Sequence, residues 1–147
     1  FQVERVALLR GCGLGGLLFI GFILQTIGLG ETPAGKSAFI TSMMVIFTPL
    51  FQALFLNRAP RRENVIGMLI VSVGLWFLTE PGGSGFNRGD LLTLLCALVF
   101  GLHIVLMDPV SRRCDALALT FLQIASSAIC GWIALFFLET PRFSWCA

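Results

Sequence analysis

Charged residues are scarce in this chain of 147 residues. They make up 12% of the sequence, whereas a typical globular domain has about 25%. Hydrophobic residues reach 56%, which excludes an intrinsically disordered chain. Ten basic and eight acidic residues are too few to solvate the surface of a soluble fold of this size. The net charge of +2 is also too small for a nucleic-acid partner, so the composition indicates an integral membrane protein in a lipid bilayer.

Signatures of metal sites, disulfide frameworks and enzymes are missing as well. The five cysteines are odd in number and widely spaced, so we expect small packing residues rather than disulfides or metal ligands. The single histidine, His103, has no carboxylate at ligand spacing, which argues against a metal. We expect it at the membrane interface or between helices, and a role in proton coupling is left open. There is no HExxH, GxSxG or Walker motif, so the sequence predicts neither an enzyme nor a cofactor.

Long apolar runs are what the sequence does contain. Charges and helix breakers divide it into five segments, which are residues 11–30, 37–57, 65–79, 91–107 and 116–138. A helix needs about 20 residues to cross the hydrocarbon core. The third segment has only 15 residues, so it would span by thinning the bilayer, with a re-entrant segment as the alternative. We predict an all-α membrane protein, a polytopic bundle of five transmembrane helices.

The links between these segments predict helix boundaries and contacts. The glycine-rich stretch 81–89 is the longest and most flexible link, and it is our candidate boundary. Asp90 is placed to cap the fourth helix, and Asp108 with Pro109 is expected to end it. Gly11 and Gly15 stand at the GxxxG spacing, which predicts a close contact with another helix.

Basic residues are unevenly divided between the two sides of the predicted bundle. One side would hold seven of them, Arg5, Arg10, Arg58, Arg61, Arg62, Arg112 and Arg113. The other side would hold three, Lys36, Arg88 and Arg142. Because basic residues gather in cytoplasmic loops, we predict that the loops at 58–62 and 112–113 are cytoplasmic in a multi-pass protein of the inner membrane.

A polar stripe follows the second segment. Its members recur at spacings of three and four residues and share one helix face, and they are Ser37, Thr41, Met44, Thr48 and Gln52. Pro49 lies within it and should kink the helix, because its ring removes a backbone hydrogen bond. Such a stripe suits a water-filled solute pathway. The alternative is that these groups only bond to neighbouring helices.

Three further polar residues are candidates for the same pathway. Gln25 lies deep in the first apolar segment, and Gln123 lies in the fifth. Lys36 stands at the start of the second segment, where the helix dipole disfavours a cation. It is either an interfacial anchor or a binding charge for an anionic group at the outer mouth, with Glu31 as a possible partner. For each glutamine, the alternative is a hydrogen bond that joins two helices.

Several segments resemble the EamA-type carriers of the drug/metabolite transporter superfamily. The block AGKSAFITS at 34–42, followed by FTPL at 47–50, looks like their fourth helix and is the most specific match. Residues 21–29 are similar to the third helix, and 58–62 with 67–74 look like the basic turn and the short fifth helix. The segment GDLLTLLCAL at 89–98 resembles the opening of the sixth helix.

The resemblance implies a ten-helix fold of two inverted five-helix repeats, of which this chain would hold helices three to seven. Residues 1–80 would then be the C-terminal part of the first repeat with three helices, and 81–89 the inter-repeat loop. Residues 90–147 would be the N-terminal part of the second repeat with two helices. The chain would be a fragment whose partners are the remaining helices of the same protein, and a homodimer is left open.

The function implied is that of a permease or exporter, which would move a small metabolite or drug-like solute by alternating access. We expect its pathway to be lined by Gln25, Lys36, Thr41, Thr48, Gln52 and Gln123. Pro49 would shape it. Proton coupling is left open. The alternative function is a non-transporting membrane subunit or assembly protein whose polar stripes bind partner helices.

Overall fold

The computed structural model describes residues 2–56, 62–78, 85–112 and 114–138, with the side chains of 2–7, 75, 76 and 78 left aside. These residues form six helices, and no strand occurs among them. The helices are α1 (Gln2–Glu31), α2 (Ala34–Ser42), α3 (Met44–Leu56), α4 (Arg62–Leu78), α5 (Arg88–Ser111) and α6 (Ala116–Leu138). The predicted all-α bundle is confirmed.

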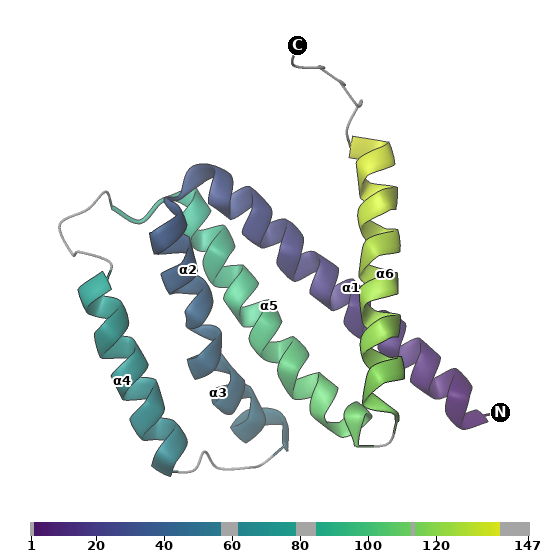
Figure 1. The fold of residues 1–147 in the computed structure, drawn as a ribbon. Coiled ribbons are helices and arrows are strands. Elements are labelled where there is room, and N and C mark those ends of the chain that lie inside the picture. The colour runs from purple at the N-terminus through teal and green to yellow at the C-terminus, as the bar shows by residue number, and fades with distance from the viewer. Residues whose placement is uncertain (1, 57–61, 79–84, 113, 139–147) are drawn as a thin grey trace.

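Four stretches are long and apolar enough to cross a membrane. They are Leu8–Glu31, Ala34–Leu56, Arg88–Ser111 and Ala116–Phe137. The remaining helix, α4, has 17 residues, which is about 25 Å of helix against a hydrocarbon core of about 30 Å. It is the short segment expected from the sequence. Successive spans run in opposite directions (Figure 1), as a multi-pass membrane protein requires.

The second span is interrupted at Met43, between α2 and α3. There the Met43 N–H donates to the Ile40 carbonyl at 3.1 Å, and the Met43 carbonyl accepts from Ile46 and Phe47. Pro49 lies six residues further on, inside α3 and buried. A proline fits a helix because its fixed φ is helical, although the carbonyl four residues earlier loses its donor. The kink expected at Pro49 itself stays a prediction.

The fourth span differs from its predicted bounds at both ends. It begins at Arg88, because Asn87 is its N-cap, and Asp90 completes a reciprocal capping box with Asn87. The expectation that Asp108 and Pro109 end this helix is wrong, since α5 continues to Ser111. Near a helix end, the missing proline N–H costs only one bond. The last turn is held by hydrogen bonds from Ser111 and Arg112 to the Asp108 carbonyl.

The central helix is α5, which α1 covers along its length and α2 and α3 cover on another side. Its buried residues therefore cover more than half of its circumference, while Leu91, Leu95 and Leu106 on the remaining face are exposed. The buried residues include Thr93, Cys96, Ala97, Gly101 and His103. In the middle of the bundle the rings of Phe22 and Phe100 stand edge to face, with centroids 5.6 Å apart. This apolar contact fixes α1 against α5.

The last helix, α6, packs against α1 at the two glycines singled out for their spacing. A Cβ atom on Gly15 would lie 2.7 Å from the Gln123 carbonyl oxygen, and one on Gly11 would overlap Leu122. The close contact predicted from the GxxxG spacing is therefore present. The rest of α6 is strongly exposed, with Leu117, Phe121 and Phe136 each more than 70% accessible, as suits a helix that faces lipid or further helices.

Candidate functional site

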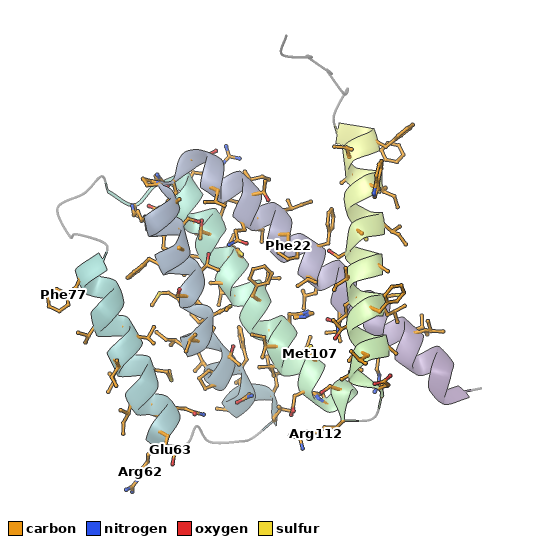
Figure 2. The ribbon with its side chains drawn as sticks, in the orientation of Figure 1. Phe22, Arg62, Glu63, Phe77, Met107 and Arg112 are labelled. Carbon is orange, nitrogen blue, oxygen red and sulfur yellow. The ribbon has the colours of Figure 1, made fainter. Side chains whose placement is uncertain are left out.

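A cavity of about 490 Å³ lies between α3 and α4. It runs along α3 from its first residue, Met44, to Gln52, and along the first half of α4, whose N-terminal end is at the bottom of Figure 1. Its α3 wall is Met44, Val45, Thr48, Pro49 and Gln52, its α4 wall is Glu63, Asn64, Gly67, Met68 and Val71, and Ile104 of α5 completes it. Figure 2 labels Glu63 at this end of α4 and Phe77 at the opposite end.

Three of the sequence-predicted residues meet in this cavity, which are Thr48, Pro49 and Gln52. The Thr48 hydroxyl donates to the Met44 carbonyl at 2.7 Å, so its proton is used within the helix and its lone pairs remain. Because Pro49 has no N–H, the carbonyl of Val45 has no helical donor. The α3 wall therefore offers hydroxyl, carbonyl and amide groups to a solute.

The other predicted pathway residues lie outside this cavity. Thr41 is half-buried, and its hydroxyl donates to the Ser37 carbonyl at 2.9 Å. Gln25 is half-buried on α1. Gln123 is 4% exposed on α6, and its Nε2 atom has no hydrogen-bond partner among the described residues. A buried amide N–H without a partner costs free energy, and the contacts of the described residues do not explain this position of Gln123.

Lys36 lies at the start of α2, far along the span from most of the cavity, and it forms an ion pair with Asp90. The Lys36 Nζ atom lies 2.6 Å from Asp90 Oδ2. The suggestion that Glu31 pairs with Lys36 is not what the structure shows, because Glu31 Oε1 lies 4.0 Å from Arg88 Nη1. The start of α5 packs against α2, so the fully buried carboxylate of Asp90 is brought to the ammonium group.

The Asp90 carboxylate is the centre of a group that we call the polar knot, made of Thr32, Lys36, Asn87 and Asp90. Besides Lys36, the carboxylate accepts the backbone N–H of Asn87 at 2.9 Å. The Thr32 hydroxyl proton is shared between Asp90 Oδ1 and Asn87 Oδ1, each 3.1 Å away. The Asn87 amide donates to the Glu31 carbonyl at 3.0 Å. The polar knot therefore ties the α1–α2 link to the start of α5.

Two glycines let the helices approach this closely. A Cβ atom on Gly28 would lie 2.6 Å from the Thr93 hydroxyl oxygen, and one on Gly89 would lie 2.8 Å from the Gly28 carbonyl oxygen. Directly inside the polar knot, the Ser37 and Thr93 hydroxyl oxygens are 3.4 Å apart and both residues are buried.

His103 lies between helices, as the sequence predicts. It is 7% exposed on α5 and faces the backbone of Leu14 on α1. Its Nδ1 atom is without a hydrogen-bond partner in the described part of the chain. Within residues 2–56, 62–78, 85–112 and 114–138, no three His, Cys, Asp or Glu side chains are grouped so that they could hold a metal ion.

Sequence reasoning missed the α4 wall of the cavity and most of the polar knot. Glu63 and Asn64 lie outside the predicted apolar segment 65–79, because their helix begins at Arg62, three residues before that segment. The Lys36–Asp90 pair had a usable signal. Both residues precede an apolar span on the same predicted side, and opposite charges there are few.

Comparison of the sequence with known proteins identifies the family of this chain. The pattern of the EamA-like transporter family matches residues 5–80. An uncharacterized transporter of Archaeoglobus fulgidus is 37% identical over 131 residues, which cover 89% of this chain and 39% of that protein. The uncharacterized transporter YvbV of Bacillus subtilis is 30% identical over 125 residues, or 84% of this chain and 40% of that protein. No solved structure matches.

The chain spans about two fifths of the length of these two relatives. This coverage is consistent with a segment of a ten-helix protein, as the resemblance of the single segments implied. The family match covers α1 to α4, and the helices found there are the apolar, mostly membrane-crossing helices that a carrier needs. The chain belongs to the EamA-like transporter family.

Proposed function

We propose that this chain is the middle part of a secondary transporter that moves a small metabolite or drug-like solute across the inner membrane by alternating access. The observation that carries the proposal is the cavity between α3 and α4. Its volume of about 490 Å³ lies within the range of about 300–1,000 Å³ for small-molecule sites. Its walls combine apolar side chains with a few polar groups, which suits weak and reversible binding.

The polar groups of the cavity favour a carrier over a catalyst. Thr48, Gln52 and Asn64 offer hydroxyl and amide groups, and Glu63 adds one carboxylate. None of these is a nucleophile paired with a base, and hydrogen bonds of this kind form and break without covalent chemistry. A solute with hydroxyl, amide or amine groups could exchange its water for these partners.

The proposed architecture assigns the described helices to two inverted repeats. Residues 1–80 are the end of the first repeat, 81–89 the inter-repeat loop, and 90–147 the start of the second repeat. The arginine-bearing loops at 58–62 and 112–113 face the cytoplasm, so the cavity lies toward the cytoplasmic side and Lys36 toward the outside. Gln25, Thr41 and Gln123 face the pathway once the helices beyond this chain are in place.

Cysteine accessibility tests the pathway without knowledge of the solute. In the full-length protein with its own cysteines replaced, Thr48→Cys and Gln52→Cys should react with a water-soluble, charged thiol reagent. Leu54→Cys is the matched control, because Leu54 is on the same helix but outside the cavity, and its side chain is 69% exposed. An exposed apolar side chain on a membrane span should face lipid, which the charged reagent does not enter, so Leu54→Cys should react far more slowly. Equal, slow reaction at all three positions would instead favour the non-transporting subunit, whose stripe only contacts partner helices.

Flux in proteoliposomes tests transport itself. Gln52→Leu in the full-length protein should lower flux roughly tenfold, which corresponds to about 1.4 kcal/mol for a lost polar contact. A panel of radiolabelled amino acids, with ethidium as a drug-like cation, supplies the probes. Thr48→Val should lower flux in the same direction, whereas Thr26→Val is its control. Thr26 makes the same hydroxyl bond to its own helix, at 2.8 Å, but is exposed on α1. Unchanged flux in both cavity variants, at equal membrane insertion, would remove the pathway assignment.

A further inference from the structure

The polar knot and the cavity lie toward opposite ends of the span formed by α2 and α3. At one end, the polar knot joins Thr32 and Lys36 to Asn87 and Asp90 across 54 to 58 sequence positions. At the other end, the cavity lies between α3 and the first half of α4. The contacts of the polar knot therefore form a barrier between α2 and α5 at the Lys36 end.

The barrier consists of polar groups whose bonds to one another can be replaced by bonds to water. The Asp90 carboxylate, the Lys36 ammonium, the Thr32 hydroxyl and the Asn87 amide are all hydrated when they separate at a membrane surface. Lys36 keeps 24% of its side chain exposed, while Asp90 has none. The middle of the α1–α5 contact is different, because it is made of the Phe22 and Phe100 rings, whose separation would expose apolar surface. The polar knot can thus open while the apolar contact holds.

The ion pair also connects two parts of the chain that the proposed repeats would move against each other. Lys36 belongs to α2 and Asp90 to α5, and the Lys36 ammonium also lies 3.4 Å from the Gly85 carbonyl in the segment just before α5. When α2 separates from α5, Asp90 exchanges its ion pair with Lys36 for water. The carboxylate and the ammonium group are 2.6 Å apart in the closed arrangement, and the loss of this charge-assisted contact biases the Lys36 end toward the closed arrangement.

We propose that the polar knot is the gate that closes the Lys36 end of the solute pathway, and that the Lys36–Asp90 ion pair is its latch. This inference rests on the proposed transport function. In the closed arrangement the gate seals Ser37 and Thr93 from water. Opening breaks the ion pair and lets water from the Lys36 side reach these hydroxyls. Asp90 and Lys36 are positioning residues, which set the balance between the two arrangements.

Labelling of a buried reporter tests the gate. The full-length protein, with its own cysteines replaced, carries Ser37→Cys, since Ser37 is 1% exposed directly inside the polar knot. The probe is a membrane-impermeant, charged methanethiosulfonate. Asp90→Asn removes the charge of the latch but keeps the shape and an acceptor for the Asn87 N–H. It should raise the labelling rate at least tenfold, and Lys36→Gln should do the same if the first variant folds poorly.

Arg88→Gln is the matched control for this experiment. It removes a basic residue from the same end, but its pair with Glu31 is exposed and 4.0 Å long, so the labelling rate should not change. An equal rate in the parent, Asp90→Asn and Lys36→Gln would overturn the latch. So would an equal increase in Arg88→Gln, because the effect would then come from charge at the surface rather than from the buried pair.

A reversible cross-link separates a gate from a static clamp. Thr32→Cys with Asn87→Cys places two thiols where the side chains already meet at 3.1 Å. Disulfide formation should abolish flux in proteoliposomes, and reduction should restore it. Complete cross-linking with undiminished flux would overturn the gate. A parent protein without flux for any probe would count against the proposed function instead, while the labelling rates would still report whether the latch controls access.

Discussion

The polar knot and the cavity, toward the two ends of the span formed by α2 and α3, contain similar polar residues in opposite situations. At the closed end, threonine, lysine, asparagine and aspartate bond to one another across helices, and Asp90 is fully buried. At the cavity end, the Thr48 hydroxyl bonds within its own helix, and Gln52, Asn64 and Glu63 line open space. The same residue types can therefore close a contact between helices or line a cavity. Which of the two they do depends on whether their hydrogen-bond partners are on another helix or on their own.

The largest effect on this contrast is expected from Lys36→Met. The substitution keeps the length of the side chain but leaves the buried Asp90 carboxylate without its cation. Removal of one member of a buried pair costs about 3–5 kcal/mol, and we expect about 3 kcal/mol here because Lys36 is partly exposed. Equilibrium unfolding of the detergent-solubilised full-length protein measures it. Arg88→Gln should cost less than about 0.5 kcal/mol. Similar losses of stability in the two variants would mean that the buried pair matters no more than the exposed one.

A smaller effect is expected from Gly28→Ala. Its new methyl group would lie 2.6 Å from the Thr93 hydroxyl and 3.0 Å from the Gly89 carbonyl oxygen, so the start of α5 has to shift. Such overpacking costs about 1–3 kcal/mol. Gly16→Ala is the control on the same helix, since its methyl group would meet nothing within 4 Å and should leave stability unchanged or slightly raised. A stability loss at Gly16 equal to that at Gly28 would show that the close approach is not the cause.

The smallest effect on stability is expected from a comparison of Thr93 and Thr48, whose hydroxyls each donate to the carbonyl four residues earlier. Thr93→Val removes a buried hydroxyl that lies beside Ser37 and donates to the Gly89 carbonyl at 2.8 Å. It should lower stability by about 1 kcal/mol. Thr48→Val, at the cavity, should change stability by less than about 0.5 kcal/mol while lowering flux. The reverse order of the two stability changes would mean that the cavity end is the more tightly packed one.

Local features of the fold were predictable from residues close together in the chain. The length of the apolar runs gave the helices, and the Gly11–Gly15 spacing gave the α1–α6 contact. The bounds of α5 were misplaced because a capping box at Asn87 and a tolerated Pro109 both extend a helix past its apolar run. The interruption at Met43 had a weak signal, because Thr41 and Ser42 precede it and their hydroxyls bond to the carbonyls four residues earlier, a pattern that often bends helices.

The candidate site was predictable only in part, and for a physical reason. Thr48, Pro49 and Gln52 share a helix face, so their common cavity follows from helical periodicity. Their partners on α4 do not, because the packing of two helices depends on how both are held by the rest of the bundle. Gln25 and Gln123 remain predictions, since they lie away from this cavity.

The sequence by itself determined that this protein is an apolar helical membrane protein of the EamA-like family, because hydropathy, charge position and short segments are properties of the chain. Only the tertiary structure decided which polar groups meet. Lys36 and Asp90 are 54 positions apart, and they pair because Gly28 and Gly89 let α1 and α5 approach and so bring the start of α5 against α2. Without Asp90 nearby, Lys36 would be an anchor at the membrane surface. With Asp90 beside it, Lys36 instead ties α2 to the start of α5.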